Sequence, residues 1–238
     1  MERYTTKTIA DKLDAFVQKN GLNHLKVFSD LLDYIIAGFD PEKRILKGWS
    51  YDTEQTRGFQ SMTHAYFVLT AQRMESCEWY DAWGDLFMDL VGNFAGYRGQ
   101  FFTPGALTDA MSELVAPERA RQAKCGAFGI RTVVNDPACG SSRTLLSINA
   151  SLIKEGKDKP YLIGEDLDHL CVKMSAINMC VHGCFGEVVC HNSLEEPRSV
   201  RFGYVINEGL YPFPGFPTIR KFADPARFIS CRQWLPKV

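Results

Sequence analysis

Short apolar segments alternate with helical patterns in the second half of the chain, and this alternation limits the possible folds more than any other feature. The expected strands and helices lie at 132–135, 142–153, 161–164, 167–181, 187–190 and 204–207. Strands that alternate with helices are typical of a parallel sheet whose two faces are covered by helices. The sequence therefore predicts an α/β fold for this half.

The first 94 residues carry apolar side chains at helical spacing. Helices are expected at 9–20, 25–40, 62–73 and 79–94, and Asn20-Gly21 and Asp40-Pro41 are the stop signals of the first two. The polar stretch 41–59 lacks periodicity and is predicted to be a long loop. We therefore expect a helical N-terminal region at 1–94 and an α/β domain at 95–238.

Composition and charge exclude several classes of protein. A chain of 238 residues with 45% hydrophobic and 23% charged residues is globular in composition, and a net charge of -1 gives no global attraction to nucleic acid. The sequence contains neither a signal-peptide pattern nor an apolar run of about 20 residues. Eight cysteines are too sparse for a disulfide scaffold. We expect a cytoplasmic protein without a membrane partner.

A strand that runs into Asp136 is followed by a turn of small residues and then by a helix. Small residues allow a ligand to approach the backbone, and the helix N-terminus offers free N–H groups to a carboxylate. The acidic side chain of Asp136 can hold an ammonium group, so an amino-acid-like ligand would satisfy both features. The alternative is an ordinary strand-to-helix turn with Asp136 near an N-cap.

Polar residues also follow the next two strands. Glu165 or Asp166 stands where nucleotide-binding folds hold a ribose, and Asn192 could hydrogen-bond a base edge. The alternatives are helix capping by Asp166 or Asp168 and an ordinary turn at Asn192.

These segments together resemble a known family. The runs GQFFTP (99–104), NDPACGSS (135–142), GEDLDHLCVKMSAINMCVHG (164–183) and CHNSLEEP (190–197) are similar in order and spacing to the N6-adenine DNA methyltransferases. In particular they resemble the modification subunits of type I restriction systems, and DAWGDLFMDLVGNFA (81–95) resembles the helix that leads into their catalytic domain. The resemblance implies a Rossmann-like S-adenosylmethionine-dependent methyltransferase sheet behind a helical region. It also implies DNA as substrate and a specificity subunit as a possible partner.

The resemblance assigns cofactor contacts residue by residue. The segment that closes over the methionine end of S-adenosylmethionine matches Gln100, Phe102, Thr103 and Pro104. The methionine-binding loop matches Asp136, Pro137, Ala138, Cys139, Gly140 and Ser141, with Ser142 where glycine is more common. The ribose contact matches Asp166, followed by Leu167. The adenine contact matches Asn192, usually Asp in the family, followed by Ser193 and Leu194.

The catalytic loop departs from the family. Asn-Pro-Pro-aromatic, which orients the target amine and stacks on the flipped base, is replaced by NEGLY at 207–211. Asn207 is predicted to orient the amine and Tyr211 to stack. We expect the 31 residues after Asn207 to be too few to complete the family's sheet. Two main hypotheses follow: an active adenine-N6 methyltransferase, or an inactive protein that binds cofactor, DNA or a partner subunit. A third is that the fold survives only as an interaction module.

Two further patterns have ordinary explanations. A zinc site at Cys180, His182, Cys184, Cys190 and His191 lacks paired Cys-x2-Cys spacing, so no metal is predicted. The basic residues after 217 could contact phosphate, or they could form a solvated surface. They are Arg220, Lys221, Arg227, Arg232 and Lys237.

Overall fold

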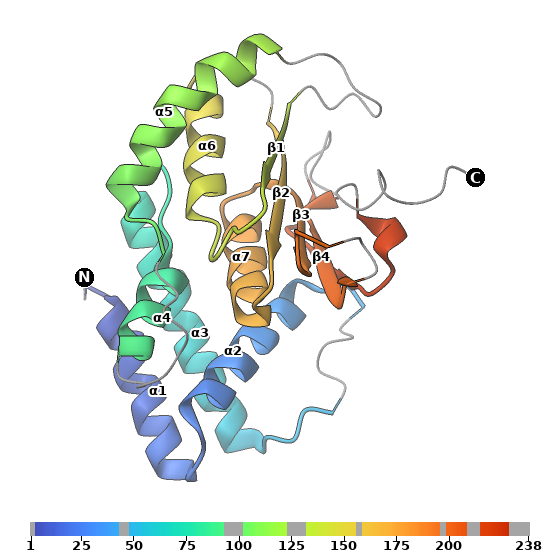
Figure 1. Cartoon of the computed structure of the whole chain (residues 1–238). Coiled ribbons are helices and arrows are strands. Elements are labelled where there is room, and N and C mark those ends of the chain that lie inside the picture. The colour runs from blue at the N-terminus through green and yellow to red at the C-terminus, as the bar shows by residue number, and fades with distance from the viewer. Residues whose placement is uncertain are drawn as a thin grey trace.

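Helices fill the first half of the chain, and a sheet with its own helices fills the second half (Figure 1). The computed structural model describes residues 3–42, 48–92, 102–122, 132–155, 159–195, 199–208 and 215–228. The helices are α1 (Thr6–Asn20), α2 (His24–Phe39), α3 (Thr53–Met74), α4 (Ala82–Gly92), α5 (Gly105–Gln122), α6 (Arg143–Lys154), α7 (His169–Val181) and the 3-10 helix η5 (Pro225–Arg227). The strands are β1 (Val133–Asp136), β2 (Tyr161–Asp166), β3 (Phe185–Cys190), β4 (Phe202–Ile206) and β5 (Ile219–Phe222).

Helix α3 begins earlier than the sequence analysis predicted. Asp52 and Gln55 form a reciprocal capping box, in which each side chain accepts a hydrogen bond from the backbone N–H of the other residue. Such a box fixes the start of a helix even where the apolar periodicity is weak. The prediction of a loop over 41–59 is therefore wrong for residues 53–59.

The first three strands are parallel and neighbours in the sheet. The pairs β1–β2 and β2–β3 run in the same direction, with Asp136 opposite Gly164 and Asp166 opposite Cys190. The segments that follow these strands therefore leave from the same edge of the sheet, where ligands bind in open α/β folds. This confirms the parallel arrangement of the first three predicted strands.

The last two strands are antiparallel, which the sequence analysis did not predict. The sheet order is β1-β2-β3-β4-β5, with β4 antiparallel to β3 and β5 antiparallel to β4. Ile206 lies opposite Gly186, so β4 ends at the amino end of β3. The connection 191–201 is shorter than the dozen or more residues of a parallel crossover, so the chain reverses.

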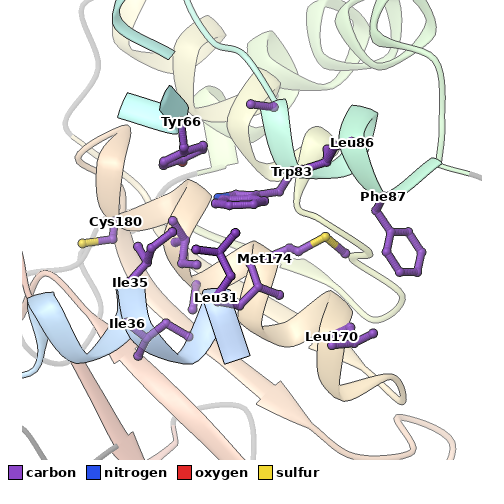
Figure 2. Packing of buried hydrophobic residues seen from close by; sticks show 14 of the residues in the cluster. Leu31, Ile35, Ile36, Tyr66, Trp83, Leu86, Phe87, Leu170, Met174 and Cys180 are labelled. Carbon is purple, nitrogen blue, oxygen red and sulfur yellow. The ribbon is translucent and has the colours of Figure 1, made fainter. Parts of the chain in front are cut away.

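Helix α7 lies at the centre of the hydrophobic core (Figure 2). Every residue from Leu170 to Cys180 is buried. A helix that is buried on all sides shows no amphipathic pattern, because each face contacts protein. On the side away from the sheet it packs against α2 and α4. Trp83 of α4 in turn stacks on Tyr66 of α3, with ring centroids 4.5 Å apart.

The helices that contact the strands, α2, α6 and α7, lie on one side of the sheet (Figure 1). On the other side a small cluster forms around Val189 and Phe228, with Val200, Val205 and Phe222 partly buried against it. Within the described ranges this second face is covered by no α-helix, so the prediction of helices on both faces is wrong for this part of the chain.

One buried hydrophobic cluster extends from α1 to β5 and includes side chains of both regions. Leu31 of α2, Trp83 of α4 and Met174 of α7 all belong to it (Figure 2). The two regions therefore share one core. The predicted domain boundary near residue 95 lies outside the described residues.

Candidate functional site

The turn between β1 and α6 (Asp136–Ser142) is the centre of the candidate site. Gly140 and Ser142 both have left-handed backbone conformations, with φ of 53° and 75°. Glycine adopts this conformation freely, whereas serine does so at a cost. The N–H of Cys139 donates to the carbonyl oxygen of Glu165 at 2.9 Å, which joins the turn to the end of β2. The result is a tight turn of small residues whose backbone a ligand can approach.

A segment that precedes α5 covers this turn. We call Phe102–Pro104 the cover segment. A Cβ atom on Gly140 would lie 2.8 Å from the ring of Phe102, so the ring rests directly on the glycine. A cavity of about 390 Å³ is lined by both the cover segment and the turn, within the size range of small-molecule sites. The predicted cofactor residues that line it are Phe102, Thr103, Asp136, Pro137, Ala138, Cys139, Gly140 and Ser141.

Asp136 shapes the turn as well as facing the cavity. Its carboxylate accepts from the N–H of Ala138 at 3.1 Å and from the hydroxyl of Thr144 in the first turn of α6. These bonds fit the alternative of an ordinary strand-to-helix turn, although Ser142 is the N-cap of α6. A carboxylate has about four lone-pair sites, so two remain for a ligand.

Asp166 touches the turn from β2 but lies outside the lining of the cavity. Its carboxylate accepts from the N–H groups of Gly140 at 2.9 Å and Asp168 at 2.8 Å. Burial raises the pKa of Asp166 above its ordinary value, although both N–H groups act to lower it. Leu167, the next residue, is 53% exposed.

The segment after β3 reaches back to the turn after β1. The hydroxyl of Ser193 donates to the carbonyl oxygen of Pro137 at 2.9 Å. Asn192 accepts from the N–H of Leu194 at 3.2 Å and donates to Glu195 at 2.8 Å, so its side chain closes a local turn. Leu194 is 93% exposed. The predicted adenine contacts thus lie at the same edge of the sheet as Asp136 and Asp166, although they do not line the cavity.

Glu165 is held on the side of β2 away from the helices. Its carboxylate accepts from Asn135 at 2.9 Å and pairs with His191. Burial acts to raise the pKa of Glu165, but the bonds from His191 and Asn135 outweigh it and lower the pKa overall. Of the two acids proposed for a ribose contact, Glu165 is therefore occupied by protein partners and Asp166 stays the candidate.

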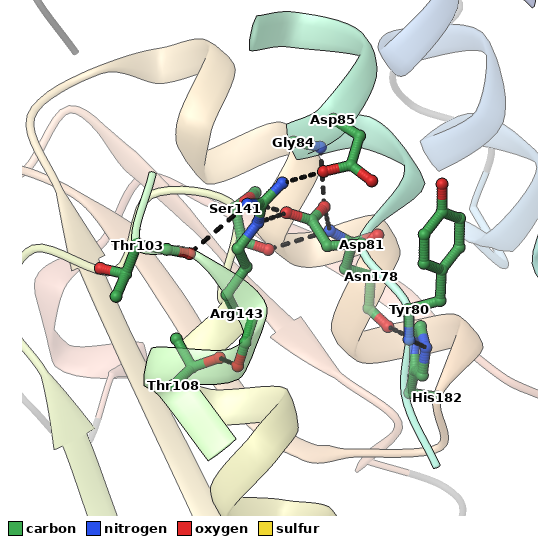
Figure 3. Close-up of polar contacts among 11 residues, drawn as sticks. Tyr80, Asp81, Gly84, Asp85, Thr103, Thr108, Ser141, Arg143, Asn178 and His182 are labelled. Carbon is green, nitrogen blue, oxygen red and sulfur yellow. Dashed lines mark hydrogen bonds and ion pairs between the residues drawn. The ribbon is translucent and has the colours of Figure 1, made fainter. Parts of the chain in front are cut away.

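A charged network joins the helical region to the turn (Figure 3). Asp81, which directly precedes α4, accepts from Ser141 at 2.5 Å, from Arg143 at 2.6 Å and from Asn178 at 2.7 Å. Arg143 also pairs with Asp85. The sequence analysis missed this network. The available signal was a cation at the first position of a helix, where the helix dipole disfavours positive charge.

Asn207, which the sequence analysis predicted to orient the target amine, does not face the candidate site. Its side chain is completely buried and donates to the carbonyl oxygens of Cys180 at 3.1 Å and Cys184 at 2.7 Å. Because β4 is antiparallel to β3, Asn207 lies at the amino end of the parallel strands, opposite to Asp136. Its amide therefore joins α7 to the sheet. Two other predicted site residues, Tyr211 of the catalytic loop and Gln100 of the cofactor contacts, lie outside the described residues.

The described part of the basic C-terminal segment is held by other side chains. Arg220 pairs with Glu208 at 3.1 Å, and Lys221 lies 4.4 Å from the centre of the Phe202 ring. Arg232 and Lys237 lie outside the described residues. The two histidines considered as zinc ligands have protein partners. His182 accepts from the N–H of Tyr80 at 3.1 Å, and His191 pairs with Glu165. Over the described ranges, no group of three or more His, Cys, Asp and Glu side chains is placed to hold a metal ion.

A crystal structure of a candidate class I S-adenosylmethionine-dependent methyltransferase from Listeria monocytogenes aligns with 97% of this chain and 70% of its own, at 15% identity and a TM-score of 0.48. None of the curated proteins matches. In the described residues, no helix is long and apolar enough to cross a membrane.

The family comparison covers the site. A model of the N-6 DNA methylase family matches residues 78–213, which is more than half of the chain. The match includes Asp81, the cover segment and the turn after β1. The cofactor of this family is S-adenosylmethionine. The chain therefore belongs to the N-6 DNA methylase family of S-adenosylmethionine-dependent methyltransferases.

Proposed function

We propose that this chain is the cofactor-binding part of an adenine-N6 DNA methyltransferase of the restriction–modification type. The observation that carries the proposal is the cavity of about 390 Å³ between the cover segment and the turn Asp136–Ser142. The turn offers a backbone free of bulky side chains, and α6 begins directly behind it. Free N–H groups at a helix N-terminus attract a carboxylate, and Asp136 attracts an ammonium. These residues fit the methionine part of S-adenosylmethionine.

The remaining contacts follow from what lies at the same edge of the sheet. Asp166 keeps lone pairs for a ribose hydroxyl, because its two N–H partners use only part of its accepting capacity. Asn192, Ser193 and Leu194 are proposed to contact the adenine ring. When bound, S-adenosylmethionine supplies an activated methyl group, and Phe102 and Thr103 exclude water from its methionine end.

The position of Asn207 favours the second hypothesis for catalysis. Its amide is buried in bonds to the carbonyl oxygens of Cys180 and Cys184, at the end of the sheet opposite to Asp136. We propose that Asn207 orients no target adenine and that the chain binds the cofactor as one part of an assembly. A specificity subunit and DNA are the proposed partners.

The first experiment tests the cofactor site by calorimetric titration with S-adenosylmethionine. Gly140→Ala places a Cβ against the ring of Phe102 and should weaken binding about tenfold or more, since inserting a methylene into a packed site costs roughly 1–3 kcal/mol. Gly183→Ala is the matched control, because Gly183 also has a left-handed backbone (φ 64°) but has no tight neighbour and lies away from the cavity. Equal affinities of the two variants, or no binding by the unaltered chain, would refute the cofactor site.

The second experiment tests the proposal for Asn207. Transfer of a radiolabelled methyl group to mixed-sequence duplex DNA is measured for the unaltered chain and for Asn207→Asp, together with melting temperature and cofactor affinity. We expect no transfer that depends on Asn207. Incorporation that disappears in Asn207→Asp, while folding and cofactor binding persist, would assign catalysis to this residue and contradict the proposal.

A further inference from the structure

Arg143 occupies an electrostatically unfavourable place. It is the first residue of α6, where the partial positive charge of the helix N-terminus repels a cation. Two carboxylates from the start of α4 compensate for this, since Arg143 donates to Asp81 at 2.6 Å and also pairs with Asp85. Its side chain is only 12% exposed. A buried cation of this kind is placed by its partners, which here come from the helical region.

The carboxylate of Asp81 is itself fixed. It is 2% exposed and accepts from the N–H of Gly84 and from the side chain of Asn178, each at 2.7 Å. The hydroxyl of Ser141 donates to it at 2.5 Å. With four kinds of donor around it, Asp81 cannot rotate away, so the guanidinium of Arg143 has one orientation (Figure 3).

The other side of the guanidinium contacts the cover segment. Arg143 donates to the carbonyl oxygen of Thr103 at 3.4 Å, and its central carbon lies 5.7 Å from the centre of the Phe102 ring. That ring rests on Gly140, at the cavity. A continuous set of contacts therefore runs from Asp81 through Arg143 and Phe102 to the turn.

We propose that Arg143, held by Asp81 and Asp85, is a positioning residue that keeps the cover segment closed over the cofactor cavity. The helical region thereby sets the residence time of the cofactor. The inference rests on the proposed cofactor site, but the placement of the cover segment can be measured without any cofactor.

The first arm of the test is hydrogen exchange of the amides that follow Pro104, at 105–108, in the free protein. Arg143→Met keeps the aliphatic stem and removes the charge and its hydrogen bonds. The matched control is Lys173→Met, which breaks another ion pair between the two regions, Lys173 to Asp33 at 2.7 Å, away from the cover segment. We expect faster exchange at 105–108 in Arg143→Met and no selective change there in Lys173→Met. Unchanged exchange in Arg143→Met would overturn the inference.

The second arm measures the affinity and dissociation rate of S-adenosylmethionine. Arg143→Met should weaken binding about tenfold, mainly through faster dissociation, as expected for loss of charged hydrogen bonds that hold a cover. Arg143→Lys, which keeps the charge, should recover part of the loss, and Lys173→Met should lower the melting temperature without changing affinity. In a Phe102→Ala background Arg143→Met should have little further effect, because both act through the same segment. Additive losses would overturn the inference, whereas faster exchange in a chain that binds no cofactor would overturn only the proposed function.

Discussion

The hydroxyl of Ser193 donates to the carbonyl oxygen of Pro137 at 2.9 Å, so the segment after β3 is joined to the turn after β1. A second bond, from the N–H of Gly140 to Asp166, joins the same turn to the end of β2. These two bonds, both between protein groups, join the ends of three parallel strands. Preorganisation of this kind reduces the entropy lost when a ligand binds.

Loss of the Ser193 bond should therefore weaken cofactor binding without unfolding the chain. We expect Ser193→Ala to reduce affinity for S-adenosylmethionine roughly two- to tenfold, which corresponds to one neutral hydrogen bond. Ser76→Ala is the control, because Ser76 is an exposed serine that donates to the carbonyl oxygen of Arg73 at 3.1 Å, away from the turn. Calorimetric titration of both variants checks the prediction, and equal affinities would contradict it.

Ser142 should respond differently to glycine and to alanine. Its φ of 75° is easy for glycine and costs roughly 1–2 kcal/mol for other residues, while its buried hydroxyl bonds to Ser175. Ser142→Gly loses the bond but relieves the backbone, so its free energy of unfolding should be close to that of the unaltered chain. Ser142→Ala loses the bond and keeps the strain, and should be less stable than the glycine variant by about 1–2 kcal/mol in urea unfolding. The opposite order would contradict the left-handed conformation.

Asn207 should be important for stability rather than for the cofactor. Asn207→Ala removes the side-chain donor to the buried carbonyl oxygens of Cys180 and Cys184 and the acceptor of the N–H of Thr218, and should cost about 2–4 kcal/mol. Asn192→Ala, which removes a local turn at the surface, should cost less than about 1 kcal/mol. Urea unfolding curves compare the two variants. A similar cost for both would show that the Asn207 amide does not hold α7 to the sheet.

From the contact between Glu165 and His191 we predict how the free energy of unfolding depends on pH in the acidic range. The pKa of Glu165 is lowered in the folded chain, so the unfolded chain binds its proton more readily. The stabilisation is complete above the ordinary pKa of 4.5 and is lost as the pH falls through the lower folded value. The free energy of unfolding should fall between pH 4.5 and the acid limit, and less steeply in Glu165→Gln. An identical slope in the variant would contradict the prediction, and Asp224→Asn at an exposed turn is the control.

The local features of the site could be predicted because they depend on neighbouring residues. The small residues between Asp136 and the start of α6 require a tight turn, and the alternation around 161–190 requires parallel strands. The short connection 191–201 indicates that β4 runs antiparallel to β3. The sequence analysis used only the apolar pattern of the strand, which does not give its direction. The capping box of Asp52 and Gln55 was a missed signal of the same local kind.

The long-range polar contacts could not be predicted in this way. Asp81 and Arg143 are 62 residues apart, and Glu165 and His191 are 26 residues apart. Each pair forms only because the fold buries the two side chains together, and any one of many acids could have paired with Arg143 or His191. The buried role of Asn207 likewise depends on the reversal of β4, which moves it from one end of the sheet to the other.

The burial of α7 on every side has a practical consequence. Its residues Leu170 to Cys180 contact the strands on one side and the helices of the N-terminal region on the other. Removal of residues 3–92 would expose to water the hydrophobic surface formed by Met174 and its neighbours. The sheet cannot therefore be excised as a portable module, and chimaeras that exchange only one half must also redesign the surface of α7.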